Sequence, residues 1–132
     1  MSDWVGVPDD ISKYIGYVYI IRNTINDRLY VGKKLFFKTV RKKPLKGNKN
    51  RRRFLIESDW KDYWGSSNEL LADIEKHGKE NFTRTILHCH RTRWEVSYNE
   101  LREQVERRVL LDKKYYNGII RVRLPAFKGS KT

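Results

Sequence analysis

The stretch that decides the fold spans residues 17–34 and reads YVYIIRNTINDRLYVGKK. Two runs rich in β-branched and aromatic residues, at 17–21 and 29–31, flank a segment of turn-forming residues, namely Asn23, Thr24, Asn26 and Asp27. This pattern predicts a β-hairpin that supplies the first two strands of a small sheet.

Side chains of the first predicted strand alternate between the two faces of the sheet. Tyr17, Tyr19 and Ile21 therefore share one face, and Val18 and Ile20 share the other. Aromatic strand residues usually pack into a core, so the alternation alone predicts only one face that carries tyrosine hydroxyls.

The sequence of the hairpin resembles that of the GIY-YIG nuclease superfamily, whose two defining tripeptides lie on the first two strands. Tyr-Val-Tyr at 17–19 stands for the first tripeptide, and Tyr-Val-Gly at 30–32 stands for the second. The first departs from the family pattern, because Tyr17 occupies the Gly position and Gly16 lies one residue early. The resemblance implies that Tyr19 and Tyr30 are catalytic.

The charge balance indicates a polyanionic partner. The 132 residues include 29 Lys and Arg against 16 Asp and Glu, which gives a formal net charge of +13. Nucleic acid is the partner that such a charge favours. The sequence has no long apolar run, signal peptide or lipidation motif, and Cys89 is its single cysteine. We therefore expect a cytoplasmic protein, of an infected bacterium if phage-encoded, that binds no membrane.

Length and local composition predict one domain at residues 15–127, between a flexible arm at 1–14 and a polar tail at 128–132. Trp4 is a candidate anchor for the arm. After the hairpin, residues 33–53 hold eleven cations and no acid, with Pro44 and Gly47 as breakers. We expect a flexible basic loop whose cations contact DNA phosphates: Lys33, Lys34, Lys38, Arg41, Lys42, Lys43, Lys46, Lys49, Arg51, Arg52 and Arg53.

A string of three aromatic residues, WKDYWGSS at 60–67, precedes a predicted short helix. Ser66 and Glu69 form a capping-box pattern, and Gly78 ends the helix. The aromatic side chains either pack in the core and over the hairpin, which we favour, or stack on splayed bases. The string and the helix after it, through Phe82, also resemble phage members of the superfamily.

The remaining sequence predicts a strand, a helix and a last strand. Residues 82–90 alternate well enough for a third strand, with His88 and His90 on one face. Ser97 with Glu100 predicts the start of a helix that runs to about Asp112. Residues 119–124 alternate as a strand with a basic face. The expected fold is α/β (α+β), a small three-stranded, mostly antiparallel sheet flanked by helices.

The resemblance implies a divalent-metal site, with Mg²⁺ or Mn²⁺ held by a glutamate on the helix after the third strand. Glu100, Glu103 and Glu106 lie on that helix, and their spacing does not choose among them. Glu100 follows Tyr98 and Asn99 in a string that resembles phage members, so it is favoured, with Glu103 as the alternative. A helix cap is the rival role for Glu100.

Two further catalytic positions follow from the resemblance. Asn117, after Tyr116, matches a Tyr-Asn segment of the family, and Arg41 matches an arginine that follows the second tripeptide. Lys33 is the alternative cation. Tyrosine ionises near pH 10, so a tyrosine base would need nearby cations, here Lys33, Lys34 and Arg41, to lower its pKa.

These features predict a metal-dependent DNA endonuclease that hydrolyses phosphodiester bonds, of the homing type or one that degrades host or rival DNA. The basic loop, the aromatic residues or a homodimer partner would supply any specificity. The alternatives are a non-catalytic RNA- or DNA-binding protein, for which charge and aromatic residues suffice, and a degenerate nuclease fold retained for binding a protein partner.

Overall fold

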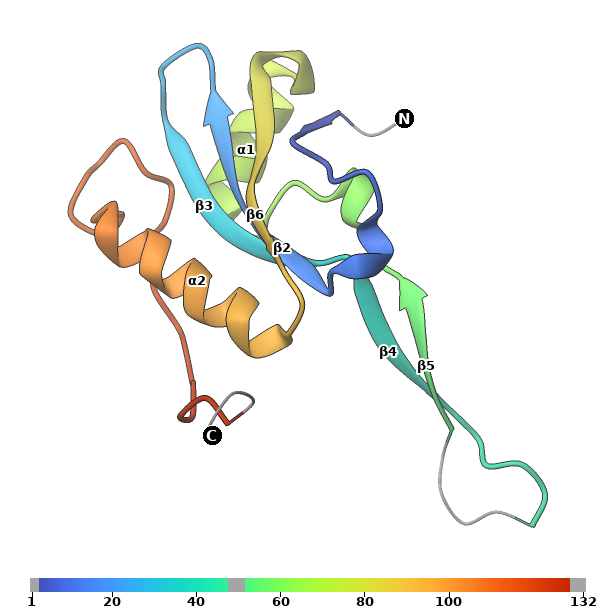
Figure 1. The fold of residues 1–132 in the computed structure, drawn as a ribbon. Coiled ribbons are helices and arrows are strands. Elements are labelled where there is room, and N and C mark those ends of the chain that lie inside the picture. The colour runs from blue at the N-terminus through green and yellow to red at the C-terminus, as the bar shows by residue number, and fades with distance from the viewer. Residues whose placement is uncertain (1–2, 48–51, 129–132) are drawn as a thin grey trace.

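The computed structural model of the chain describes residues 3–47 and 52–128. A four-stranded sheet lies at its centre, with the strand order β1-β6-β2-β3 (Figure 1). The hairpin of β2 (Gly16–Asn23) and β3 (Leu29–Leu35) is antiparallel, and β6 (Phe82–His90) pairs antiparallel with β2. The expected α+β class and its three main strands are confirmed.

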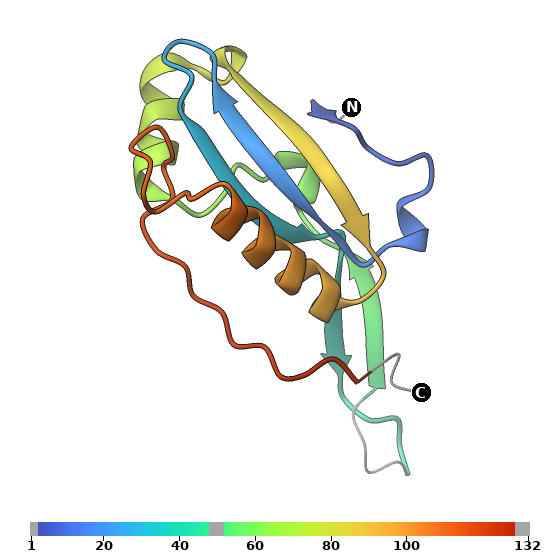
Figure 2. The ribbon, with the colours of Figure 1, turned by 60° about the vertical axis from the view of Figure 1, so that its left-hand side comes forward.

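Helices cover both faces of the sheet (Figure 2). α1 (Asn68–His77) packs against one face, and α2 (Arg93–Glu106) crosses the other. The described residues also form three short 3₁₀ turns, η1 (Ile11–Lys13), η2 (Trp60–Asp62) and η3 (Lys79–Asn81). Within the described ranges, no helix is long and apolar enough to cross a membrane.

The predicted alternation of the first strand places its side chains in two separate cores. Tyr17, Tyr19 and Ile21 are buried with Trp60 and Leu70 on the α1 side of the sheet. Val18 and Ile20 pack with Val31 and Val109 on the other side. The expected shared face for the tyrosines is therefore confirmed.

The alternation predicted for residues 82–90 does not run through the whole strand. The pairing of β2 with β6 shifts between Val18 and Tyr19, which leaves Leu87 as an extra residue. Such a bulge reverses which face each later side chain takes. Ile86 therefore packs on the α1 side, as does Cys89, three residues later, while Leu87 packs on the α2 side.

The N-terminal segment is part of the fold, unlike the flexible arm that we expected at residues 1–14. Trp4 and Val5 form β1, which pairs parallel with β6. Trp4 is 6% exposed, and its indole N–H donates to the carbonyl of Trp60 at 2.8 Å. Trp4 is thus the anchor that the sequence suggested, and the described residues from 3 onward are docked.

The predicted basic loop is largely regular structure. β4 (Phe37–Lys42) and β5 (Arg52–Glu57) form a separate antiparallel ribbon that projects from the sheet (Figures 1 and 2). The loop prediction was wrong because strand-favouring residues lie within and just after the basic run, Phe37 and Val40 in β4 and Phe54, Leu55 and Ile56 in β5. Lys49 and Arg51 lie outside the described residues, and the side chain of Arg52 is not described.

Both helices begin at residues other than those predicted. Ser67, not Ser66, caps α1, since its hydroxyl accepts a bond from the backbone N–H of Leu70 at 3.3 Å. Thr92 caps α2 and bonds with Glu95, so Ser97 and Glu100 lie inside the helix and not at a cap. α2 ends at Glu106, before the predicted end near Asp112.

The strand predicted at residues 119–124 does not form. This segment is irregular and runs back along α2 (Figure 2). It is held at its far end by Trp94, whose indole N–H donates to the carbonyl of Pro125 at 2.8 Å and whose ring packs on Phe127. The start of the β3 edge is not available to residues 119–124, because Lys114, Tyr115 and Tyr116 already pair with Leu29 there.

Candidate active site

A cavity of about 520 Å³ opens at the edge of β3, between the start of α1 and the middle of α2. Its lining brings together residues that are far apart in the sequence, among them Tyr30, Ser66, Glu100, Gln104, Asn117 and Arg121. Three of these, Tyr30, Glu100 and Asn117, are predicted site residues. Sequence reasoning assigned no such role to Ser66, Gln104 or Arg121.

Two glycines make room for the tyrosines at this cavity. A Cβ atom on Gly32 would lie 2.5 Å from the Tyr19 hydroxyl and 3.0 Å from the Tyr30 ring. Gly65 has φ +91°, and a Cβ there would lie 3.2 Å from the Tyr30 ring. Packing therefore explains why the second tripeptide ends in glycine, because a side chain at position 32 would clash with Tyr19 and Tyr30.

Tyr30 presents its hydroxyl to the cavity. The Tyr30 and Ser66 hydroxyls lie 3.2 Å apart, so Ser66, which the sequence suggested as a helix cap, contacts the candidate catalytic tyrosine. Burial raises the pKa of Tyr30, and the hydrogen bond with Ser66 opposes this only in part. The expectation that nearby cations lower this pKa was wrong, and Tyr30 is protonated at neutral pH.

Tyr19 lies behind Tyr30 and away from solvent. Its side chain is 1% exposed, and the centroids of the two rings are 6.2 Å apart. Burial raises the pKa of Tyr19 far above its usual value, and the neighbouring Tyr30 and Tyr63 add to the shift. Tyr19 therefore packs behind the ring of Tyr30 and is too buried to contact a substrate.

Glu100 is the helix glutamate that reaches the cavity. Its side chain is 18% exposed, and its Oε1 lies 4.0 Å from the ammonium nitrogen of Lys33. Burial raises the pKa of Glu100, and Lys33 opposes that rise. Lys33 in turn donates to the Ser97 hydroxyl at 2.7 Å, which fixes the ammonium group beside the carboxylate.

The other two glutamates of α2 have different surroundings. Glu103 contacts His88 at 3.1 Å and accepts from Arg107 at 3.2 Å. Burial would raise the pKa of Glu103, but these hydrogen bonds outweigh it and hold the pKa below its usual value. Glu106 is exposed and pairs with Arg102. Neither glutamate lines the cavity, so the geometry favours Glu100 over Glu103 as metal ligand.

Asn117 binds the backbone of the strand that carries Tyr30. Its Oδ1 accepts from the N–H of Val31 at 3.0 Å, and its Nδ2 donates to the carbonyl of Val31 at 2.8 Å. Gln104 also donates to that carbonyl, at 3.2 Å. The amide of Asn117 thus takes the place of a neighbouring strand, and it holds Tyr30 in position from the next residue.

This arrangement predicts a linked loss of stability and activity in Asn117→Ala. The change leaves the buried N–H of Val31 without its partner, which costs about 1–3 kcal/mol in the free energy of unfolding. We expect a fall in melting temperature of roughly 3–8 °C, measured by circular dichroism, together with weaker DNA cleavage. Asn117→Asp keeps the oxygen that accepts from Val31. Its melting temperature and its cleavage rate should therefore lie between those of the wild type and of Asn117→Ala. Lost cleavage at unchanged stability would contradict this positioning role.

Arg41 does not reach the cavity. It lies on β4, where it is exposed and faces Arg53 across the ribbon. Other cations do lie near the predicted chemistry: Lys33 is beside Glu100, and Arg121 is in the cavity lining. Gln104 could have been found from the sequence, because it lies four residues after Glu100 and so on the same helix face.

The residues at the cavity fit a divalent cation of the Mg²⁺ type. In the parts of the chain that the structure describes, no three His, Cys, Asp or Glu side chains gather as a metal site. The oxygen donors at the cavity instead include two carboxylates, Glu100 and Glu69, and the hydroxyls of Tyr30 and Ser66. Glu69 is paired with Arg28, which leaves Glu100 as the better candidate ligand. Mg²⁺ suits such a set, because it keeps several waters and takes one or two carboxylates together with substrate phosphates.

The chain is similar to a known protein family. A family model described as "Putative endonuclease segE, GIY-YIG domain" matches residues 4–120. No curated protein and no solved structure matches the chain. The match spans both tripeptides, α2 and Asn117, and it begins at the docked Trp4. The chain therefore belongs to the GIY-YIG family of endonuclease domains.

Proposed function

We propose that this chain is a divalent-metal-dependent endonuclease that hydrolyses phosphodiester bonds in DNA at the cavity between Tyr30 and Glu100. The observation that carries the proposal is the convergence of Tyr30 from β3 and Glu100 from α2 in one cavity, with Lys33 beside the carboxylate. The family match supports an endonuclease of this fold. The net charge of +13 supports a polyanionic substrate.

Each residue at the cavity has a distinct task in this proposal. Glu100 would hold a metal ion, which would supply stabilisation of negative charge on the phosphate and on the leaving 3′ oxygen. The protonated Tyr30 hydroxyl, bonded to Ser66, orients the attacking water. As the water oxygen bonds to phosphorus and the bond to the 3′ oxygen breaks, Tyr30 accepts a proton from the water and passes its own through Ser66 to solvent. Lys33 and Arg121 offset charge on the phosphate. Asn117 and Tyr19 keep Tyr30 in place.

We extend the proposal to a phage-encoded enzyme of the homing or DNA-degrading type that acts in the cytoplasm of an infected bacterium. Support comes from the resemblance of residues 60–82 to phage members of the family. The predicted contacts of Lys34, Lys42, Lys43, Lys46 and Arg53 with DNA belong to the same proposal.

The test is incubation of the purified chain with supercoiled plasmid and with single-stranded RNA, in Mg²⁺, in Mn²⁺ and in EDTA. We expect nicked or linear plasmid in either metal and intact plasmid in EDTA. Binding of nucleic acid without cutting in any metal would instead support the non-catalytic binding protein. Cutting of RNA but not of plasmid would correct the substrate.

A further inference from the structure

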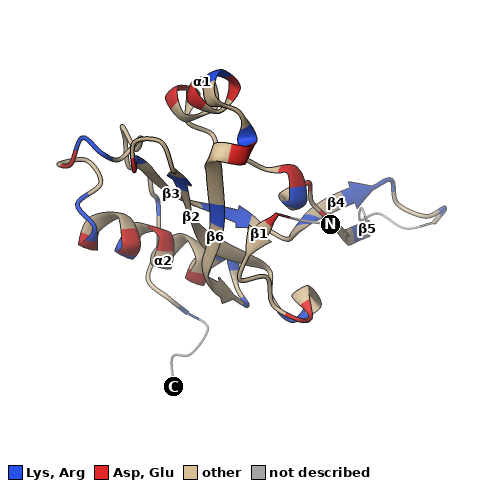
Figure 3. Cartoon of the chain, turned by 90° about the horizontal axis from the view of Figure 1, so that it is seen from above, with Lys and Arg blue, Asp and Glu red and all other residues tan. Residues whose placement is uncertain are grey.

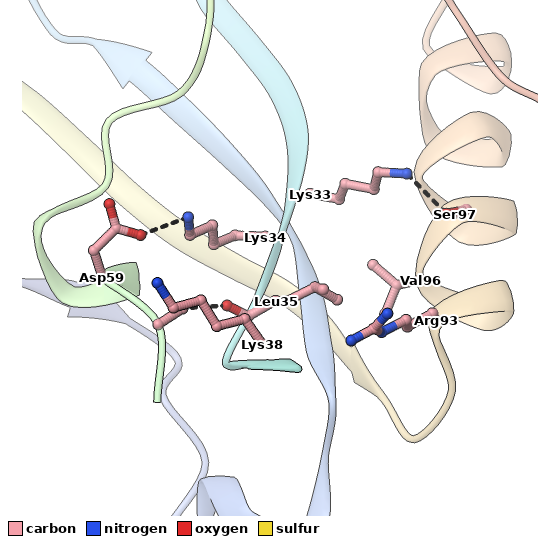
Figure 4. Close-up of a pocket in the computed structure, with 9 residues that line it drawn as sticks. Lys33, Lys34, Leu35, Lys38, Asp59, Arg93, Val96 and Ser97 are labelled. Atoms are coloured by element: carbon pink, nitrogen blue, oxygen red, sulfur yellow. Dashed lines mark hydrogen bonds and ion pairs between the residues drawn. The ribbon is translucent and has the colours of Figure 1, made fainter. Parts of the chain in front are cut away.

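A second cavity, of about 610 Å³, adjoins the candidate active site (Figure 4). It lies where β3 passes into β4 and faces the first turns of α2. Its lining is rich in cations, namely Lys33, Lys34, Lys38 and Arg93, with Ser97 and Asp59 beside them. We call it the cationic cleft.

Two of the four cations in the cationic cleft are not paired with an acid. Lys34 pairs with Asp59 at 2.6 Å, which is the one acid in the lining. In the described ranges, Lys38 and Arg93 have no carboxylate within 4.0 Å. A guanidinium nitrogen of Arg93 instead donates to the Thr39 hydroxyl at 2.7 Å, which aims the group across the cleft toward β4. Concentrated charge of one sign in a hollow attracts an anion.

The cationic cleft and the active-site cavity have separate linings, but an ion pair joins them. Lys33 lines the cleft, donates to Ser97 and stands 4.0 Å from Glu100. Arg93 precedes Glu100 by two helical turns, which is about 10 Å along α2. Adjacent phosphates of one DNA strand are several ångströms apart. A strand with its scissile phosphate at Glu100 therefore reaches the cleft within a few nucleotides.

The ribbon of β4 and β5 carries further Lys and Arg residues, drawn in blue (Figure 3). Arg41 of β4 lies directly opposite Arg53 of β5. Like charges in opposed positions destabilise a pair of strands, and a bound anion between them removes the penalty. The major groove of duplex DNA is also wide enough for a two-stranded ribbon of this kind.

We propose that the cationic cleft, through Lys33, Lys38 and Arg93, binds the DNA backbone on the ribbon side of the scissile phosphate and guides the duplex onto β4 and β5. The proposal assigns a role to Arg93, which the basic run of residues 33–53 does not include. It rests on the proposed function, because the direction of the DNA is set from Glu100.

The test measures binding separately from cleavage. Lys38→Gln with Arg93→Gln is compared with Lys13→Gln with Lys76→Gln, a control that removes two exposed cations outside the cleft. A fluorescein-labelled duplex about three helical turns long is titrated in EDTA, and its anisotropy is followed at several salt concentrations. We expect the cleft variant to lose about tenfold or more in affinity and its salt slope to fall by about two, with the control near wild type.

Lys38→Gln alone controls for a folding defect in the double variant, since it leaves the hydrogen bond from Arg93 to Thr39 in place. It should give about half of the change in salt slope. In cleavage assays the cleft variant should raise KM and leave kcat near wild type. A cleft variant that binds like the control would overturn the proposal even if the chain cuts plasmid. If plasmid stays uncut but the cleft variant loses affinity as expected, the proposed nuclease activity is wrong and the cleft is still a nucleic-acid-binding site.

Discussion

Glu100→Gln is expected to lower the rate of DNA cleavage by about a thousandfold or more. The change keeps the size of the side chain and removes the charge that would hold the metal ion. Of the two carboxylates in the described lining of the cavity, Glu69 is paired with Arg28, whereas Glu100 is bonded to no arginine or histidine. A thousandfold loss corresponds to about 4 kcal/mol in the activation barrier, which is in the range for removing a group that stabilises transition-state charge.

The same change should make the folded protein more stable at neutral pH. Burial raises the pKa of Glu100 in the folded state, so ionising this carboxyl costs more there than in the unfolded chain. The folded state binds the proton more tightly, and stability falls as pH rises from the unfolded pKa through the folded one. Gln carries no charge and escapes this loss. We expect a higher melting temperature for Glu100→Gln at pH 7 and little difference at acidic pH.

Two matched variants on α2 separate this role from a general effect of charge. Glu106→Gln removes an exposed carboxylate and should leave cleavage and stability near wild type. Glu103→Gln weakens the contacts with His88 and Arg107, so it should lower stability while cleavage in the folded protein persists. Cleavage that survives Glu100→Gln and disappears in Glu103→Gln would move the metal ligand one turn along the helix.

The central hairpin and the third strand could be predicted because their local signals agree with their tertiary setting. The alternation of residues 17–21 matches the two cores that β2 separates. The glycine at position 32 also agrees with its surroundings, since the rings of Tyr19 and Tyr30 leave no space for a side chain there. The pairing of Tyr30 with Glu100 came from family resemblance, because no local pattern reports a contact between a strand and a distant helix.

Other features depended on contacts that the sequence does not display. The N-cap of α1 is Ser67 and not Ser66, and the N-cap of α2 is Thr92 and not Ser97. All four side chains are chemically able to cap a helix. The bulge at Leu87 changes the faces of the strand end through pairing with β2. Arg121 reaches the cavity only because its segment runs back along α2 in place of forming a strand.

Tyr30→Phe is expected to lower the rate of cleavage by about a hundredfold, with little change in stability. The loss is typical for removing a side chain that transfers or positions a proton. Stability should hold because the ring is kept and the hydroxyl makes one partly exposed bond, to Ser66 at 3.2 Å. Single-turnover cleavage of plasmid at saturating protein measures the rate, and thermal unfolding checks the fold.

Tyr19→Phe is the matched variant and should have the smaller effect on the rate. The Tyr19 hydroxyl is enclosed between Gly32 and Gly65, whereas Tyr30 lines the cavity. Removing it affects the support of Tyr30 and not the contact with the attacking water. An equal or larger loss in Tyr19→Phe would show that the buried hydroxyl takes part directly in the reaction.

The pH dependence distinguishes a protonated Tyr30 from a phenolate base. A phenolate whose pKa lies above 10 would make the rate climb about tenfold per pH unit through pH 7–9. A hydroxyl that orients water and relays its proton is already in its working form across that range. We therefore expect the rate to fall on the acid side as Glu100 becomes protonated and to be flat from pH 7 to 9. In Tyr30→Phe the acid limb should remain, because it belongs to Glu100.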